Sequence, residues 1–314
     1  MPPLKGQSVF LTGAAGFIGS HVARRLVAAG ARVHVLLRPQ GDHTRIAGLL
    51  PRLTVHEGDL RNDWQIRRAW EKCRPDLIVN AAIQRTRGTT GERRQAFQVG
   101  LAATLALLEC AAEFSCRHFL HLGSSTEYGS APDAMREDQG PDPVCFHGAV
   151  KAASTILCRT FARMQNLPVT VLRLFHVYGP GETPNRLIPT VVRAAFDGQE
   201  LLLTKPGYCR DYVFIDDVVA ACIACLGRDL PPGEIINIGS GRQTANEDIV
   251  QTIQAVTGRR IRVRIGVHPA RPWDKKSWQA DIERARQLLD WQPEYSLARG
   301  IARTVAAVRQ SRAA

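Results

Sequence analysis

Three glycines near the start of the chain have a spacing suited to phosphate binding. They belong to the sequence GAAGFIG at positions 13–19, which follows a short apolar run and opens a helical pattern. Glycine lets the backbone approach a diphosphate closely, and the N-terminus of the following helix attracts the negative charge. The spacing differs from the general Gly-x-Gly-x-x-Gly fingerprint. Its place between a strand and a helix still predicts a dinucleotide site that includes Gly13, Gly16, Phe17, Ile18 and Gly19.

The residue after the second apolar run indicates which dinucleotide is bound. An NAD-specific site has a carboxylate there, which accepts a hydrogen bond from the adenosine 2′-hydroxyl. This chain has Arg38 instead, and a guanidinium attracts the 2′-phosphate of NADP. Asp42, four residues further on, offers a carboxylate for the ribose of NAD. We therefore expect NADP as the cofactor, with NAD as the alternative.

Two further segments follow predicted strands and extend this site. Asp59 and Leu60 follow the third strand and suit a contact with the adenine amino group. Ala81 and Ala82 follow the fourth strand, where small side chains allow a cofactor to approach closely. All four residues are therefore predicted to bind the dinucleotide.

The elements that position these residues alternate between strand-like and helical patterns. The predicted strands are 8–12, 32–37, 53–56, 77–80, 119–122 and 170–174, and the predicted helices are 17–29, 64–73, 93–114 and 148–164. This alternation predicts an α/β fold with a doubly wound parallel sheet over residues 1–175. After residue 175 the rhythm loosens and proline and glycine become frequent. Residues 176–314 are therefore predicted to form mainly a smaller substrate-binding domain, with the strand 235–238 returning to the sheet.

Composition excludes several classes of protein. The chain has 314 residues with 45% hydrophobic and 22% charged residues, values typical of a folded globular protein. Its net charge of +12 favours anionic partners, but the basic residues are scattered, so we expect no nucleic-acid partner. No apolar run reaches the ~18–20 residues that span a bilayer, and no signal-peptide pattern precedes the first strand. We therefore expect a cytoplasmic protein without a membrane partner.

The cysteines do not predict a metal site. The chain has eight, and only the pair Cys222 and Cys225 has a spacing typical of metal ligands. No second such pair and no nearby histidine pair completes a set of four ligands. We expect all eight to be reduced thiols and the protein to hold no metal.

Four later segments carry a resemblance to a known family. They are GSSTEYG at 123–129, LRLFHVYGP at 172–180, RDYVFIDD at 210–217 and NIGSG at 237–241. Together with the glycine segment they resemble the extended short-chain dehydrogenase/reductases, often called NAD-dependent epimerase/dehydratases, over nearly the whole chain. The resemblance implies a Rossmann-type fold and a homodimer. It also implies hydride transfer between a nicotinamide and a carbon of a nucleoside-diphosphate sugar.

The family places a serine or threonine beyond the fifth strand, where it hydrogen-bonds the reacting oxygen. The resemblance assigns this role to Ser125, with Ser124 as the alternative because the segment is one residue shorter than usual. Glu127, two residues further on, resembles the acid residue of the family's dehydratases. A dehydratase activity therefore stays open.

The helix after the fifth strand departs from the family pattern. The family has Tyr-x-x-x-Lys there, with the tyrosine as acid/base and the lysine holding the nicotinamide ribose. This chain keeps Lys151 but has His147 at the position of the tyrosine, one helical turn away on the same face. The pKa of an imidazole is near 6.5 unaided, and a neighbouring lysine cation lowers it. His147 is expected to be the acid/base, with a relay that involves Tyr128 or a non-catalytic role as alternatives.

Four residues are implied to bind the substrate. Arg210 belongs to the motif that reaches the substrate diphosphate in this family, and Arg271 is a second candidate. A guanidinium contacts phosphate oxygens in a bidentate fork. Asn185 lies in the segment that matches the loop around the nucleotide, and His176 stands where the family usually has asparagine.

These features predict an NAD(P)-dependent oxidoreductase that reduces the 4-keto group of a nucleoside-diphosphate sugar. The sequence SSTEYG especially resembles reductases of 4-keto-6-deoxy sugars. The alternatives are an NAD-dependent C4 epimerase, a dehydratase that uses Glu127, and a non-catalytic nucleotide-binding protein. Replacement of the family's tyrosine by His147 is the main support for the last of these.

Overall fold

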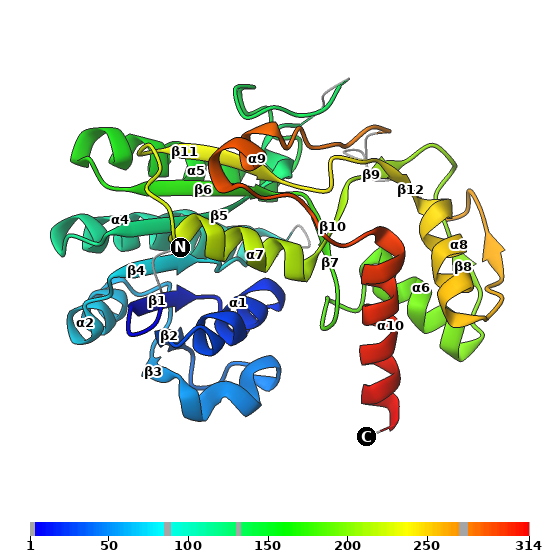
Figure 1. Cartoon of the computed structure of the whole chain (residues 1–314), viewed down its shortest axis with the longest axis horizontal. Helices are drawn as coiled ribbons and strands as arrows, with labels where there is room; N and C mark the ends of the chain where they lie inside the picture. Colours follow the sequence, from blue (N-terminus) through cyan, green and yellow to red (C-terminus); the bar gives the residue numbers. More distant parts are fainter. Residues whose placement is uncertain (1–3, 85–88, 130–132, 270–275, 314) are drawn as a thin grey trace.

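Seven parallel strands form the central sheet (Figure 1). The computed structural model describes residues 4–84, 89–129, 133–269 and 276–313. In spatial order the strands are β11 (Glu234–Ile238), β6 (Val169–Leu174), β5 (His118–Ser124), β4 (Leu77–Asn80), β1 (Ser8–Thr12), β2 (Arg32–Leu37) and β3 (Thr54–Glu57). The central strands are buried along their whole length and mostly apolar, because helices cover both faces of the sheet. The predicted α/β fold is confirmed.

Two apolar clusters fill the space between the sheet and its helices. One joins the sheet to α1 (Phe17–Ala28) and α7 (Ile215–Leu226), and the other joins it to α2 (Asp63–Cys73), α4 (Ala103–Glu113) and α5 (Phe146–Gln165). Successive residues of a strand point to opposite faces, so Phe10 and Leu11 belong to different clusters. Each helix therefore packs against its own side of the sheet.

The predicted helix 93–114 is longer in the structure and is interrupted. It comprises α3 (Thr90–Phe97), a π-helical turn (Gln98–Ala102) and α4. Within the described ranges, the stretch Thr90–Glu113 is the one helix long and apolar enough to cross a membrane by length and composition. Half of its most apolar window is buried, and α4 packs against α2 and α5. This helical stretch is therefore part of the helical layer on one face of the sheet.

The chain beyond β6 builds a second lobe, which Figure 1 shows to the right of the sheet. We call it the C-terminal lobe. Its helices are α6 (Leu187–Asp197), α8 (Asn246–Thr257) and α10 (Leu297–Ala313). Its strand pairs are β7 (His176–Tyr178) with β10 (Tyr212–Phe214), β9 (Cys209–Arg210) with β12 (Thr244–Ala245), and β8 (Leu201–Leu202) with β13 (Val263–Arg264).

The chain passes between the sheet and the C-terminal lobe several times. It returns to the sheet for α7, which packs on α1, and for β11, which pairs with β6. It then forms α8 in the lobe and comes back once more for α9 (Glu283–Leu289), which contacts β11. Several elements that follow residue 175 therefore complete the sheet layers.

The order of the strands reverses between β1 and β4. From β1 the chain continues outward through β2 and β3, and it then crosses to β4 and continues through β5 and β6 on the other side. In open parallel sheets of this kind, the crevice beyond the carboxyl ends at the reversal binds the ligand. The predicted glycine segment follows β1 directly, so it lies at this crevice.

Candidate active site

The glycine segment forms a tight turn from β1 into α1. Gly13 has a φ of +70°, and a Cβ atom there would lie 2.8 Å from backbone atoms of Ala81 and Ala82. A Cβ atom on Gly19 would collide with the carbonyl of Gly13. The turn, the start of the helix and the segment after β4 therefore lie in direct backbone proximity, which only glycine permits.

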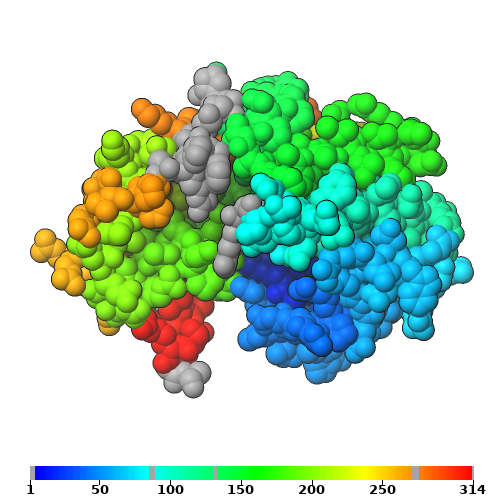
Figure 2. All heavy atoms as spheres, turned by 180° about the vertical axis from the view of Figure 1, so that it is seen from behind, coloured from blue at the N-terminus to red at the C-terminus, as the bar shows by residue number. Residues whose placement is uncertain are grey.

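A groove of about 430 Å³ runs along this edge of the sheet. Figure 2 shows the hollow, with the dark-blue N-terminal segment recessed beneath the blue and cyan surface. Ten of the residues predicted to bind the dinucleotide line it, namely Gly13, Gly16, Phe17, Ile18, Gly19, Arg38, Asp59, Leu60, Ala81 and Ala82. The eleventh, Lys151, lies on α5 and is not among the lining residues. The donor set and the narrow backbone cradle fit a dinucleotide.

The outer end of the groove has an excess of cationic groups. Arg38 and Arg45 line it, and Arg38 is exposed. Arg61 also lines it and forms an ion pair with Asp59, with an Nη2–Oδ2 distance of 2.6 Å. Hydrogen bonds from Arg61 lower the pKa of Asp59, and those from Thr44 lower the pKa of Asp42. Both carboxylates are thus ionised at pH 7 and already accept hydrogen bonds within the chain.

Behind the groove, a buried polar chain joins the ends of three strands. Thr12 donates to Oδ1 of Asn80 (2.7 Å) and accepts from the backbone N–H of Ala82 (3.2 Å). The Nδ2 atom of Asn80 donates to Oγ1 of Thr104 (3.0 Å) and lies 3.1 Å from Nδ1 of His121. These hydrogen bonds fix the residues after β4 against α4. Sequence reasoning missed Thr104 and His121, which carry no motif.

Lys151 is buried on the inward face of α5. It is 5% exposed, and its Nζ atom donates to the carbonyl of Leu122 on β5 (2.6 Å). Burial lowers the pKa of Lys151 to about 8, although the Glu127 carboxylate acts in the opposite direction. His147 is half-buried in the first turn of α5, so it lies one turn before Lys151 as predicted from their spacing.

The two candidate serines differ in their surroundings. Ser125 is 2% exposed, and its Oγ atom accepts a hydrogen bond from Nε1 of Trp278 (2.9 Å). Ser124 is half-buried at the end of β5, and its Oγ atom lies 2.8 Å from Oγ1 of Thr126. Ser124 is thus the more accessible hydroxyl, while Ser125 accepts from the indole and keeps its own O–H to donate, so the choice between the two stays a prediction.

Glu127 forms a buried ion pair. Both of its carboxylate oxygens are engaged: Ser124 donates its backbone N–H to Oε1 (2.8 Å), and Arg173 donates Nε to Oε2 (2.9 Å). Glu127 and Arg173 are 0% and 3% exposed, and the guanidinium of Arg173 lies over the ring of Tyr128. A carboxylate paired in this way is not presented to a substrate. The role of Glu127 as a dehydratase acid stays a prediction, and it would require this ion pair to rearrange.

The substrate side of the site is organised around Trp278. Trp278 donates a hydrogen bond to Ser125, and its ring lies edge-on to the ring of His176, with 6.1 Å between the centroids. The guanidinium carbon of Arg210 lies over the indole, 5.6 Å from its centroid. The Nδ1 atom of His176 is buried without a hydrogen-bond partner in the part of the chain that the structure describes. Burial lowers the pKa of His176 well below its ordinary value, and Arg186 and Arg210 lower it further. The ring is therefore neutral at pH 7.

The structure brings two of the four predicted substrate residues together. His176 and Arg210 both face Trp278, which sequence reasoning did not identify because a single tryptophan carries no motif. Asn185 is exposed in the turn before α6. Arg271 lies outside the described residues.

Comparison with known proteins gives this site its context. The model of the NAD dependent epimerase/dehydratase family matches residues 9–239, which is more than half of the chain. The protein belongs to this family. Membership confirms the resemblance inferred from the motifs at 13–19, 123–129 and 172–180.

Several members of the NAD dependent epimerase/dehydratase family are similar to this chain over nearly its full length. An uncharacterized UDP-glucose epimerase, YtcB of Bacillus subtilis, is 28% identical over 95% of this chain and 96% of its own. The crystal structure of UDP-glucose 4-epimerase with UDP-glucose from Thermotoga maritima has a TM-score of 0.89 and 27% identity, covering 96% of this chain and 99% of its own. MoeE5 in complex with UDP-glucuronic acid and NAD has a TM-score of 0.85 and 28% identity, covering 97% and 99%.

Proposed function

We propose that this family member is an NADP(H)-dependent enzyme that reduces the 4-keto group of a nucleoside-diphosphate sugar. The groove that begins at the glycine turn carries the proposal, because its narrow backbone cradle suits a dinucleotide. The similarity to proteins in complex with UDP-sugars and NAD supports the substrate class and the nicotinamide chemistry. The cofactor preference rests on Arg38, which occupies the end of β2 in place of a carboxylate.

In this proposal the dinucleotide supplies the hydride, and three side chains act on the sugar or on the bound cofactor. The hydroxyl of Ser125, with that of Ser124 as the alternative, donates a hydrogen bond to the carbonyl oxygen and stabilises the negative charge that develops on it. His147 gives the proton to that oxygen. Lys151 holds the nicotinamide ribose, because its ammonium donates one N–H to the carbonyl of Leu122 and has two more for the ribose hydroxyls.

The substrate diphosphate is proposed to lie against Arg210, beside His176 and Trp278. The guanidinium of Arg210 lies over the indole, and a guanidinium can offer two parallel N–H groups to a phosphate. Asn185 and Arg271 stay proposed contacts for the nucleotide and the diphosphate.

A C4 epimerase is the second candidate, because the similar proteins named above include UDP-glucose epimerases. The same three side chains would serve both directions of hydride transfer. An epimerase retains its oxidised cofactor through a full cycle, whereas a reductase must exchange it. The exposed Arg38 at the open end of the groove favours exchange with free NADP(H).

Nucleotide analysis and a substrate screen distinguish these activities. We expect the purified protein to release no stoichiometric nucleotide on denaturation and to oxidise NADPH in the presence of a nucleoside-diphosphate 4-keto sugar. Release of about one equivalent of NAD, with interconversion of UDP-sugars and no net oxidation of NADPH, would instead identify an epimerase. If no sugar in the screen is converted but dinucleotide still binds, the enzymatic proposal is wrong.

Replacing Arg38 tests the cofactor preference. Arg38→Ala is expected to raise the Kd for NADPH at least about tenfold, because one charge-assisted contact contributes roughly 1.5–3 kcal/mol. The Kd for NADH should change by less than about threefold, since NADH lacks the 2′-phosphate. Arg163→Ala, which removes an exposed arginine from the end of α5, is the matched control. Equal losses for both nucleotides, measured by calorimetry, would contradict the preference.

A further inference from the structure

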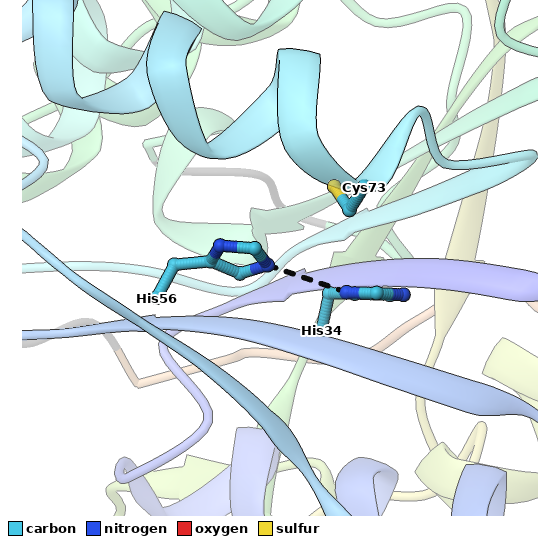
Figure 3. A group of neighbouring side chains, drawn as sticks. All are labelled: His34, His56 and Cys73. Atoms are coloured by element: carbon cyan, nitrogen blue, oxygen red, sulfur yellow. Dashed lines mark hydrogen bonds between the residues drawn. The ribbon is translucent and has the colours of Figure 1, made fainter.

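Three side chains capable of binding a metal converge at the edge of the sheet. His34 lies on β2, His56 on β3, and Cys73 is the last residue of α2 (Figure 3). One potential ligand atom from each lies within 4.8 Å of the others. These residues are far apart in sequence, and none belongs to a motif identified above. They lie on the face of the sheet that α2 covers, and none lines the nucleotide groove.

The pairing of the two strands produces this convergence. β2 and β3 are parallel, with Leu36 opposite His56 and His34 opposite Thr54. His34 and His56 are thus diagonal neighbours on one face, and their rings stack at 28° with centroids 5.5 Å apart. The C-terminal end of α2 lies over this pair and brings Cys73 to it (Figure 3).

The spacing of the nitrogen atoms fits a tetrahedral ion. Nδ1 of His34 lies 3.3 Å from Nε2 of His56. Zn–N bonds of about 2.0–2.1 Å at a tetrahedral angle also place two nitrogen atoms about 3.3–3.4 Å apart. The Cys73 thiol makes only a long contact of 3.7 Å with the carbonyl of Trp70, so little is lost when it turns to an ion.

The surroundings allow an ion to enter. All three side chains are half-buried, and His56 lines a cavity of about 300 Å³ together with Trp64 and Lys72 among others. Lys72 adds positive charge beside His56, so a negatively charged ligand is needed to hold a cation. Cys73 supplies that charge once an ion displaces its proton, because burial raises the pKa of the free thiol to about 12.

We propose that His34, His56 and Cys73 form a site for a divalent transition-metal ion, with Zn²⁺ as the best fit. Two imidazoles and one thiolate are ligands that Zn²⁺ prefers, and water completes the tetrahedron from the cavity side. On binding, the Cys73 thiol releases its proton to solvent and the sulfur forms the bond to the metal. The ion would tie the edge strand β3 to β2 and to α2, independently of the proposed enzymatic function.

Metal titration of the full-length protein tests this site. After removal of metals with a chelator, we expect the protein to bind one equivalent of Zn²⁺, measured by competition with a chromophoric chelator. Co²⁺ should give the visible absorption of a tetrahedral complex together with a thiolate charge-transfer band, and Zn²⁺ should abolish both. At a Zn²⁺ concentration of about 100 times Kd, the Tm should rise, because the ion binds only the folded state.

Variants of the cluster make the test specific. His56→Ala is expected to weaken Zn²⁺ binding at least about tenfold, and Cys73→Ser to remove the charge-transfer band. His268→Ala, which removes an exposed histidine from another part of the chain, should bind as the unmodified protein does. Circular dichroism checks that each variant is folded. The proposal is overturned if no single equivalent binds, if the cobalt complex lacks the thiolate band, or if His56→Ala and Cys73→Ser leave binding unchanged.

Discussion

Replacing His147 by phenylalanine is expected to lower kcat by about 10²–10⁴-fold, the usual contribution of a positioned acid or base. The imidazole lies in the first turn of α5, one turn before the buried Lys151, and a phenyl ring at this place keeps the volume but carries no proton. Binding of NADPH should stay within about threefold, because the groove residues are unchanged. Steady-state kinetics with the 4-keto sugar found in the screen, combined with calorimetry for NADPH, separates these two effects.

Two further variants show whether the lower kcat of His147→Phe reflects the loss of proton transfer. His147→Tyr restores the phenol typical of the family and should recover a substantial part of kcat with an altered pH profile, because its proton carrier has a different ordinary pKa. His268→Phe makes the same change as the phenylalanine variant at an exposed position and should leave kcat unchanged. Full activity of His147→Phe would remove this residue from the mechanism.

Breaking the ion pair between Glu127 and Arg173 is expected to have the largest effect on stability. Both side chains are buried, and Glu127→Gln leaves the Arg173 guanidinium without a counter-charge. Removal of one partner of a buried pair costs about 3–5 kcal/mol of the free energy of unfolding. Denaturant unfolding measures this loss, and the unfolding temperature should fall on the order of 10 °C.

A second substitution and an exposed pair serve as controls for this effect. Adding Arg173→Met to Glu127→Gln removes both charges and should restore more than half of the lost free energy of unfolding. Arg136→Gln breaks an exposed pair with Asp138 and should cost less than about 1 kcal/mol. If Glu127→Gln is as stable as the unmodified protein but loses turnover selectively, then Glu127 is a catalytic acid and the structural role assigned here is wrong.

The sheet and the lining of the groove could be predicted because each rests on a local rule. Apolar runs identify the strands and helical periodicity identifies the helices. A glycine between a strand and a helix marks the phosphate-binding turn. Gly13 shows why the rule holds, since the turn gives it a positive φ that favours glycine. Such constraints act over a few residues and can be recognised in a single sequence.

The remaining contacts depend on pairs that are distant in the chain. Trp278 hydrogen-bonds Ser125 across 153 positions, and nothing local to either residue indicates it. His34 and Cys73 meet only because the register of β2 and β3 and the end of α2 coincide. Glu127 shows a further limit, because its sequence position is compatible with a substrate contact and only the orientation of Arg173 shows a buried ion pair. These contacts depend on long-range packing and on the direction of side chains, which a local sequence pattern does not contain.

The repeated passage of the chain between the sheet and the C-terminal lobe makes the two halves inseparable as fragments. A polypeptide that ended after β6 would expose that strand's free edge, since β11 pairs with it, and would leave the apolar surface under α7 in water. Such an unpaired edge is prone to aggregate. New substrate specificities in this protein must therefore arise by changes in its loops. Exchange of the whole C-terminal lobe would also remove elements that complete the sheet.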